Sequence, residues 1–423
     1  MAAQGKSFDH ANAMPASTWR FLNANDVAIE VPEGLAVASD VRVSGSFEMG
    51  DDGAFDRALD CAQVAWELEH PAPTAEEIAE REKYRAAESD ATYGGTAQSR
   101  YQENADALEE ARSLSAAFEH GTGGEVASFL REAAGERTVM RVSPGESAKA
   151  SVVVSADPGV LSVGALDIIA LRGSEVSVSI VVDSPEGASS EAAAVAGTTV
   201  RVYADEDAHV RVARVQTLEN GCIDIDDMGL IALDRARIEV SQTVLGATST
   251  FTGLAGDLRG DSARVSVETR YLGWAEQSRD FNYSLRHHGA RTRCNLNANG
   301  VLAGKSSKTL RGTIDLVRGC KGAEGSENET VLLVDEGVRN TTVPVILCNE
   351  DDVAGNHGAT IGHIRKEQLF YLESRGIPRE AAEALFVQAV IEQAAIEAPV
   401  EAARAAVVRL GERLEPGFSE RFN

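Results

Sequence analysis

Histidines are the residues of this chain best suited to metal binding or proton transfer, and the pair His357 and His363 stands out. Neutral imidazole is a good ligand for iron and zinc, and its pKa of about 6.5 lets it titrate close to neutrality. His357 lies in the small, polar segment DDVAGNHGATIGH, which is unsuited to a core. If this segment is extended, residues six positions apart face the same side. These residues alone leave a functional and a structural role for His357 both open.

Two further groups could do chemistry. His287 and His288 are adjacent, so in a strand at most one of them reaches a given site. We interpret this pair as part of a polar turn or an outer face. Asp224, Asp226 and Asp227 could bind a hard cation through oxygen ligands. Polysaccharide-cleaving β-helices use clustered acidic residues, often with calcium, so a carbohydrate-active solenoid is an alternative; an acidic loop in an acidic chain is the simpler interpretation.

Several standard catalytic motifs are missing from the sequence. It contains no GxxxxGK[ST], GxSxG or HExxH. These absences exclude a P-loop, a nucleophile elbow and the zinc-binding helix of HExxH metalloproteases. The segment GVLAGKSSK lacks P-loop spacing and is expected to be a β-turn.

The net charge of the chain limits the kinds of partner that it can bind. A net charge of −26 over 423 residues argues against binding to nucleic acid or to an anionic membrane. We find neither a signal-peptide pattern at the N-terminus nor an apolar run of about 20 residues, which a membrane span needs. We therefore expect a cytoplasmic protein.

The cysteines are five in number, widely scattered and without a CxxC pair. This pattern predicts neither a disulfide framework nor a self-contained zinc site. Cys61 falls on the apolar side of an expected helix, so we assign it to the core.

Helical periodicity dominates the N-terminal part after an irregular arm over residues 1–35. A helix is expected from about Ala54, and Thr74 with Glu77 forms a capping-box pattern for the next one. Helical character resumes in NADALEEARSLSAAFEH and EVASFLREAAGE. Residues 1–137 are thus expected to form an N-terminal arm and helical region.

Near Thr138 the period changes from about 3.6 to 2 residues. The alternating or β-branched segments are TVMRV, KASVVVSA, DIIALRG, SEVSVSIVVD, TTVRVYAD, HVRVARVQT, ARIEVSQTV, ARVSVETRYL, RTRCNLNANGVL, SKTLRGTIDLV and ETVLLVD. No convincing amphipathic helix interrupts them, which excludes parallel α/β folds. Sandwich, propeller and solenoid remain. The small branched side chains and the low aromatic content of 5% favour a β-solenoid over residues 138–363, whose open ends the helical flanks could cap.

Residues 364–423 return to helical periodicity. In RKEQLFYLESRG the pattern places Leu369, Phe370 and Leu372 on an apolar face, followed by a stop at Gly376. Pro378 is expected at the first position of the next helix. A last helix follows Pro399, with Ala403, Val407 and Leu410 in line.

The segment DDVAGNHGATIGHIRKEQLFYLESRGIP closely resembles the hallmark C-terminal segment of the SufB/SufD family, the scaffold subunits of the SUF iron–sulfur cluster assembly machinery. The resemblance extends upstream through HHGARTRCNLNANGVLAGKSSKTLRGTIDLVRGCKGAEGSENETVLLVDEG. Met14-Pro15 and Trp19-Arg20 are similar to a family Pro followed by a Trp-Arg pair.

Within this family the resemblance is greater to SufD-type chains. SufB-type chains carry a glutamate after the histidine and an essential cysteine about thirty residues upstream. Here Gly358 follows His357, and Asn328–Leu332 contains no cysteine. Two positions depart from the SufD pattern: Gly355 replaces a frequent cysteine, and Ala389-Val390 replaces Gly-Phe.

The resemblance implies a right-handed parallel β-helix with helical flanks and a non-catalytic role. It implies pairing with a SufB paralogue through the β-helix, and binding of the ATPase SufC through the C-terminal helices. It assigns His357 to a transient iron–sulfur cluster or iron site shared with the partner subunit. For ATPase docking we select residues of the first C-terminal helices: Glu367, Leu369, Phe370, Tyr371, Arg375 and Leu385. A self-pairing scaffold of a reduced SUF system is the alternative within the family.

Overall fold

A computed structural model describes residues 5–16, 24–38, 40–69, 114–115, 118–185, 193–364 and 366–422. It divides into two compact units, Asp51–Phe118 and the remainder of the chain, which we describe separately. Within the described residues, no helix is both long and apolar enough to cross a membrane.

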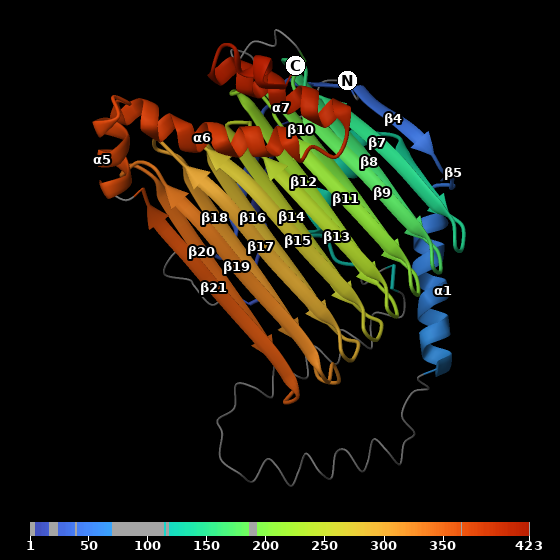
Figure 1. Ribbon diagram of the computed structural model, residues 1–423. Coiled ribbons are helices and arrows are strands. Elements are labelled where there is room, and N and C mark those ends of the chain that lie inside the picture. Colours follow the sequence, from blue (N-terminus) through green and yellow to red (C-terminus); the bar gives the residue numbers. More distant parts are fainter. Residues whose placement is uncertain are drawn as a thin grey trace. The chain divides into compact units, whose positions relative to one another are not determined.

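The larger unit is a parallel β-solenoid, which confirms the predicted fold class (Figure 1). Each coil contributes one strand to each of two sheets, and strands two apart in the chain pair in parallel. The even-numbered sheet contains β6 (Arg137–Val142), β8 (Val160–Ala170), β10 (Ala194–Ala204), β12 (Cys222–Ala232), β14 (Ser249–Leu258), β16 (Ser278–His287), β18 (Ser307–Leu316) and β20 (Arg339–Cys348). The odd-numbered sheet contains β7 (Ser147–Ser155), β9 (Glu175–Asp183), β11 (His209–Gln216), β13 (Arg237–Val244), β15 (Arg264–Gly273), β17 (Arg293–Leu302), β19 (Ala323–Leu333) and β21 (Val353–His363).

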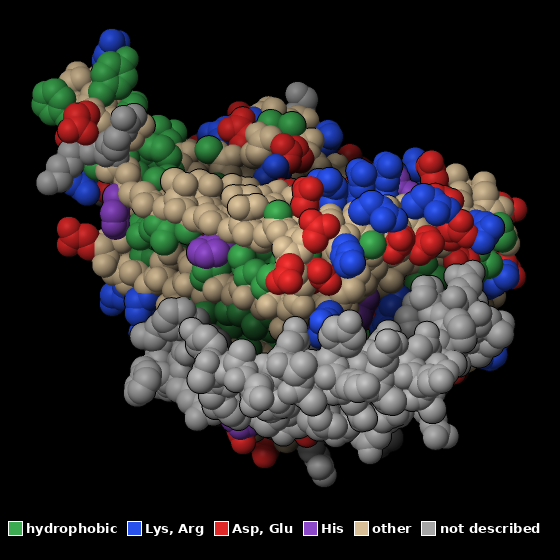
Figure 2. All heavy atoms as spheres, turned by 90° about the horizontal axis from the view of Figure 1, so that it is seen from below, with side chains coloured by type: hydrophobic (Ala, Val, Ile, Leu, Met, Phe, Trp, Pro, Cys, Tyr) green, Lys and Arg blue, Asp and Glu red, His purple; other side chains and the backbone are tan. Residues whose placement is uncertain are grey.

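One turn of each coil holds a residue in the left-handed region, among them Asp207 (φ 60°), Arg235 (φ 58°) and Arg291 (φ 57°). This conformation is unfavourable for residues other than glycine. Here Asp207, Arg235 and Arg291 each donate the backbone N–H to a carbonyl of the next coil, as Asp207 does to Asp234 at 2.9 Å. The turns also carry opposite charges in neighbouring coils, such as Arg235 with Asp207 at 2.8 Å. Figure 2 shows basic and acidic side chains gathered together on one half of the face that it presents.

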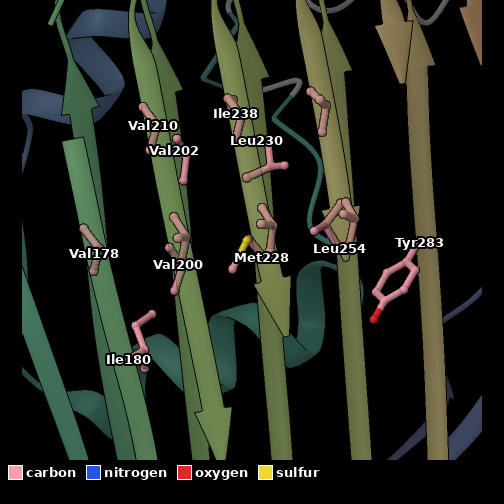
Figure 3. Packing of buried hydrophobic residues seen from close by; sticks show 14 of the residues in the cluster. Val178, Ile180, Val200, Val202, Val210, Met228, Leu230, Ile238, Leu254 and Tyr283 are labelled. Atoms are coloured by element: carbon pink, nitrogen blue, oxygen red, sulfur yellow. The ribbon is translucent and has the colours of Figure 1, made fainter. Parts of the chain in front are cut away.

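The core is a stack of aliphatic side chains between the two sheets. Figure 3 shows Val200, Met228 and Leu254 following one another from strand to strand, with Ile180 and Ile238 from the other sheet. Successive coils place similar side chains in register, so each coil covers the one before it.

The two ends of the solenoid differ. At the first coil, β4 (Asp40–Ser46) pairs antiparallel with β7, and β5 (Glu48–Met49) pairs antiparallel with β6. At the last coil, β20 and β21 are the terminal strands of their sheets, with no further strand beside either among the described residues. The solenoid is therefore closed by β-pairing at one end and open at the other.

The N-terminal arm is more regular than its sequence predicts. β1 (Lys6–Ala11) and β2 (Val27–Val31) form an antiparallel pair, and a short β3 (Ala36–Val37) adds to β8. With α4 (Gly124–Ala134), which confirms a predicted helix, these strands share an apolar cluster with the outer face of the even-numbered sheet. The expectation of an irregular arm is wrong here because Phe8, Ile29 and Val31 are buried in that cluster. The predicted Trp19-Arg20 feature lies outside the described residues.

Helices cover part of the outer face of the odd-numbered sheet (Figure 1). They are α5 (Lys366–Ser374), α6 (Arg379–Ile396) and α7 (Glu401–Leu414), followed by the short η2 (Phe418–Phe422). The buried side of α7 contains Ala403, Val407 and Leu410, as predicted. Gly376 adopts φ 84° after α5, which confirms the predicted stop, whereas Pro378 is the N-cap of α6 rather than its first residue.

The smaller unit contains α1 (Ala54–Glu69), a predicted helix, in which Phe55 and Leu59 are buried. Cys61 is exposed, so its assignment to the core is wrong. The expected helix over residues 74–87 lies outside the described residues. Of the helical segment expected over 104–120, only 114–115 and 118–120 are described, and they are not helical.

Candidate functional site

His357 lies on β21, the terminal strand at the open end of the solenoid, and its side chain is exposed. Its orientation follows from Gly355, two residues earlier. A Cβ at Gly355 would lie 3.0 Å from Ile346 and 3.6 Å from Leu316, both of the opposite sheet. Because side chains alternate along a strand, His357 faces the same interior side. It is exposed because no further coil follows among the described residues.

His363 shares this strand and this side with His357, so the predicted common parity is confirmed. Six residues of extended strand separate the two by roughly 20 Å. A single metal ion needs nitrogen ligands at about 2.0–2.1 Å. The two histidines therefore cannot bind the same ion.

A charged cluster lies inside the solenoid directly before this last coil. Lys308 of β18 and Glu329 of β19 form a fully buried ion pair. The hydroxyl of Tyr271 donates to Glu329 Oε1 at 2.9 Å, and that of Thr342 donates to Glu329 Oε2 at 2.5 Å. Both carboxylate oxygens of Glu329 are thus hydrogen-bonded, and its charge is balanced by Lys308.

Glu327, two residues before Glu329, is a second interior glutamate. It is the register partner of His357, on the strand adjacent to β21. Only 4% of its surface is exposed, and its carboxyl group lies over Gly312 of β18, where an added Cβ would come within 2.4 Å. Burial, together with the nearby charge of Glu329, raises the pKa of Glu327 to about 7.

The sequence analysis missed Glu327, Glu329 and Lys308. A weak signal was present in GSENETV, where Glu327 and Glu329 share strand parity with the apolar Val331. The structure confirms that parity, since these three residues are buried and Glu324, Asn328 and Thr330 are exposed.

The aspartates of β12 are not an acidic loop, nor an accessible cation site. Asp224 and Asp226 are completely buried inside the solenoid and pair with Arg214 at 2.6 and 3.1 Å. Burial raises the pKa of Asp226 to about 6. Asp227 faces the other side, where Thr122 donates to it at 2.7 Å. None of the three can contact a polysaccharide, which removes the basis of the carbohydrate-active alternative.

The interpretation of His287 and His288 as a polar turn or outer face is wrong for His287 and correct for His288, which follows β16 in the turn. His287 ends β16 with no exposed surface, and its Nδ1 lies 2.8 Å from the Thr292 hydroxyl. Burial lowers the pKa of His287 to about 4. His288 is half-buried and pairs with Asp257 at 2.7 Å. Both histidines have structural contacts.

The residues selected for partner docking do not share one environment. Leu369 is buried at 6% exposure, whereas Phe370 and Tyr371 beside it are 71% and 55% exposed. Leu385 on α6 is 45% exposed, and Glu367 and Arg375 are exposed. Of the predicted apolar face, Leu369 and Leu372 pack in the cluster with Ile364 and Ala382, whereas the prediction is wrong for Phe370. In Figure 2 hydrophobic side chains are visible on the projection at the left, where α5 lies in Figure 1.

Metal-ligating side chains do not form a complete site within the described residues. No group of three or more His, Cys, Asp or Glu among them could hold a metal ion. Cys294, the cysteine nearest the interior glutamates on the paired strand, is buried, and burial raises its thiol pKa to about 12. Cys348, the last residue of β20, is exposed.

Comparison with known proteins identifies this architecture. Residues 152–390 match the family model described as "SUF system FeS cluster assembly, SufBD core domain". The chain is similar to the iron–sulfur cluster assembly protein SufD of Bacillus subtilis, with 27% identity over 213 residues, 50% of this chain and 49% of that protein. It is 29% identical over 208 residues to an iron–sulfur cluster assembly SufBD family protein of Mycobacterium leprae, covering 48% of this chain and 23% of that protein.

A SufBD family protein of Staphylococcus saprophyticus shows 25% identity over 202 residues, 48% of this chain and 43% of that protein. The matched regions thus span about half the length of these curated relatives or less. The family model, however, covers more than half of this chain and includes the strands that carry Glu327 and His357. The chain therefore belongs to the SufB/SufD family of iron–sulfur cluster assembly proteins, and within that family it is SufD-like.

Proposed function

We propose that the chain is a non-catalytic scaffold subunit of a cytoplasmic iron–sulfur cluster assembly complex. It pairs through the open end of its solenoid with a second solenoid subunit, a SufB paralogue, and it binds the ATPase SufC through its C-terminal helices. The observation that carries this proposal is the exposed position of His357 on the inner side of the open last coil.

The two terminal strands support pairing with another β-subunit. β20 and β21 have 10 and 11 residues and present unpaired backbone N–H and C=O groups along their free edges. Such edges favour addition of a strand from another chain. The arm residues Met14 and Ala24 pack against Val343 and Val345 on the outer face of β20. The free edges and the inner side of the last coil therefore remain for a partner.

The exposed aromatic residues of α5 support a protein partner at the helices. Phe370 and Tyr371 are more than half exposed, while the adjacent Leu369 fixes the helix to the solenoid. Exposed aromatic side chains on a fixed element are typical of interface anchors. Because the chain has no P-loop, ATP hydrolysis belongs to the docked partner.

The iron–sulfur cluster is a transient cargo in this proposal. His357 can supply one imidazole nitrogen, and Gly355 and Gly358 beside it supply no side-chain ligand. Thiolate donors, which hold most iron–sulfur clusters, come from the partner subunit in this proposal. A cluster held between two subunits can be released when they separate.

The test is co-expression of the chain with a cognate SufB paralogue and a cognate SufC-type ATPase. We expect all three to co-purify as one complex after two affinity steps directed at different subunits. A complex of the chain with itself and the ATPase alone, able to hold a stoichiometric cluster, would replace the heterodimer with the self-pairing scaffold. Absence of any complex would contradict the proposal.

A further inference from the structure

Glu327 is a buried carboxyl group that the structure leaves without a partner. It is 4% exposed, and it forms no hydrogen bond or ion pair within the described part of the chain. Removing a carboxylate from water without a donor or a cation is costly. Such a group is retained at low cost only when a proton or a cation neutralises it.

The neighbouring cation does not serve this purpose. Lys308 directs its ammonium group to Glu329 and donates to the Thr342 hydroxyl at 3.1 Å. Glu327 also feels the lysine charge but forms no ion pair with it, and burial together with Glu329 still makes its charged form unfavourable. Glu327 is therefore the carboxyl group of this cluster that still lacks a paired positive charge.

Glu327 lies close to the open end of the solenoid. Glu327 and His357 are register partners on adjacent parallel strands, and both side chains point to the interior. Adjacent strands lie about 4.8 Å apart. Two side chains at that spacing can reach one ion between them, whereas His363 cannot join them.

We infer that Glu327 and His357 together form this chain's half of a divalent transition-metal site, with ferrous iron as the intended ion. The inference rests on the proposed function, which it deepens by naming a second ligand. One imidazole nitrogen and one carboxylate oxygen suit Fe(II). Two donors leave the coordination incomplete, in keeping with a site that a partner subunit or sulfide completes.

Gly312 is part of the arrangement. A Cβ at this position would lie 2.4 Å from the carboxyl carbon and oxygens of Glu327. Glycine therefore leaves the space that the carboxyl group occupies, and Gly312→Ala displaces that group without changing either ligand.

The experiment is an anaerobic titration of the metal-free full-length chain with ferrous iron alone, repeated with cobalt(II) as a spectroscopic probe. We expect one high-affinity site in the parent protein, weakened about tenfold or more in Glu327→Gln, His357→Ala and Gly312→Ala. Glu324→Gln and His363→Ala are the matched controls, because Glu324 is the exposed register partner of Ala354 and His363 lies further along β21. Both controls should bind like the parent.

Circular dichroism and thermal unfolding of each variant establish that the solenoid is intact. Unchanged affinity in Glu327→Gln beside lost affinity in His357→Ala would overturn the role of Glu327 and leave the proposed function standing. No ferrous binding by the parent protein would overturn the inference as well. The proposed function is decided separately, by the three-subunit co-purification.

Discussion

His357 and Glu327 are register partners on the last two strands of one sheet, so an exposed histidine and a buried glutamate occupy adjacent positions on its inner face. Nearly every inward residue of the earlier coils is covered by a neighbour in the next coil. At His357 this covering stops. His357 lies where the stack is incomplete, and the residues behind it form a charged layer, like the buried pair of Arg214 and Asp224 in an earlier coil.

The buried pair of Lys308 and Glu329 yields the first prediction. Lys308→Met leaves Glu329 with hydroxyl donors but without a cation, and removing one member of a buried pair costs about 3–5 kcal/mol. Because a solenoid can lose terminal coils separately, hydrogen exchange should accelerate mainly in β19 and β21. The double variant Lys308→Met/Glu329→Gln should recover most of the protection. Unchanged exchange in the single variant would show that the pair does not stabilise the end coils.

We expect the buried His287 to lower the stability of the folded chain in acid. Its folded-state pKa of about 4 lies below the ordinary value of 6.5, so between these values the unfolded chain takes up a proton that the folded chain does not. Stability therefore falls as the pH falls from 6.5 to 4, by roughly 3 kcal/mol at about 1.4 kcal/mol per pH unit.

The measurement is urea unfolding of the parent and of His287→Asn at pH 7 and at pH 4. Asparagine keeps a donor toward Thr292 but does not titrate. The variant should lose less stability over this range by roughly the same 3 kcal/mol. Equal losses in the two proteins would show that His287 can accept its proton in the folded state.

In α5, neighbouring residues are expected to affect either ATPase binding or stability, but not both. Phe370→Ala with Tyr371→Ala should leave thermal unfolding unchanged and abolish co-purification with the ATPase, since both side chains are exposed. Leu369→Ala should instead cost about 2–5 kcal/mol, because it empties a buried position. Retained ATPase binding in the first variant would place the docking surface elsewhere.

Cys348 can report on occupation of the open end. It is exposed on the terminal strand β20, and Cys61 is exposed in the separate smaller unit. A partner at the open end should slow alkylation of Cys348, as measured by peptide mass spectrometry. The buried Cys294, whose thiol pKa is raised to about 12, should react in neither state. Unchanged alkylation of Cys348 in the complex would contradict binding at this end.

Burial of both faces explains some of the strands that the sequence analysis missed, although β8, β10 and β18, also buried on both faces, were found from their β-branched runs. β13 and β15 have one face inside the solenoid and one partly exposed, so their residues alternate clearly. β12, β14 and β16 have both faces buried, one by the core and one by the N-terminal arm and its neighbours, which removes the alternation. β12 also places Asp224 and Asp226 inside, where a pattern of apolar residues is expected.

The site was likewise predictable only in part. His357 could be found from its small polar surroundings and from the resemblance of its segment to a family. Its proximity to Glu327 depends on the length of one coil, which sets the register between β19 and β21. Coil lengths vary along the chain, since Leu254 pairs with Met228 but Pro344 with Gly312, offsets of 26 and 32 residues. Strand parity alone therefore could not bring the two residues together.

The most direct test of the account measures iron and acid-labile sulfide in the anaerobically reconstituted three-subunit complex. Complexes containing His357→Ala should assemble and unfold like the parent but hold little of either element. His363→Ala, exposed on the same strand and side, should hold as much as the parent. A full complement of iron and sulfide in the His357→Ala complex would contradict the central role given to the open end of the solenoid.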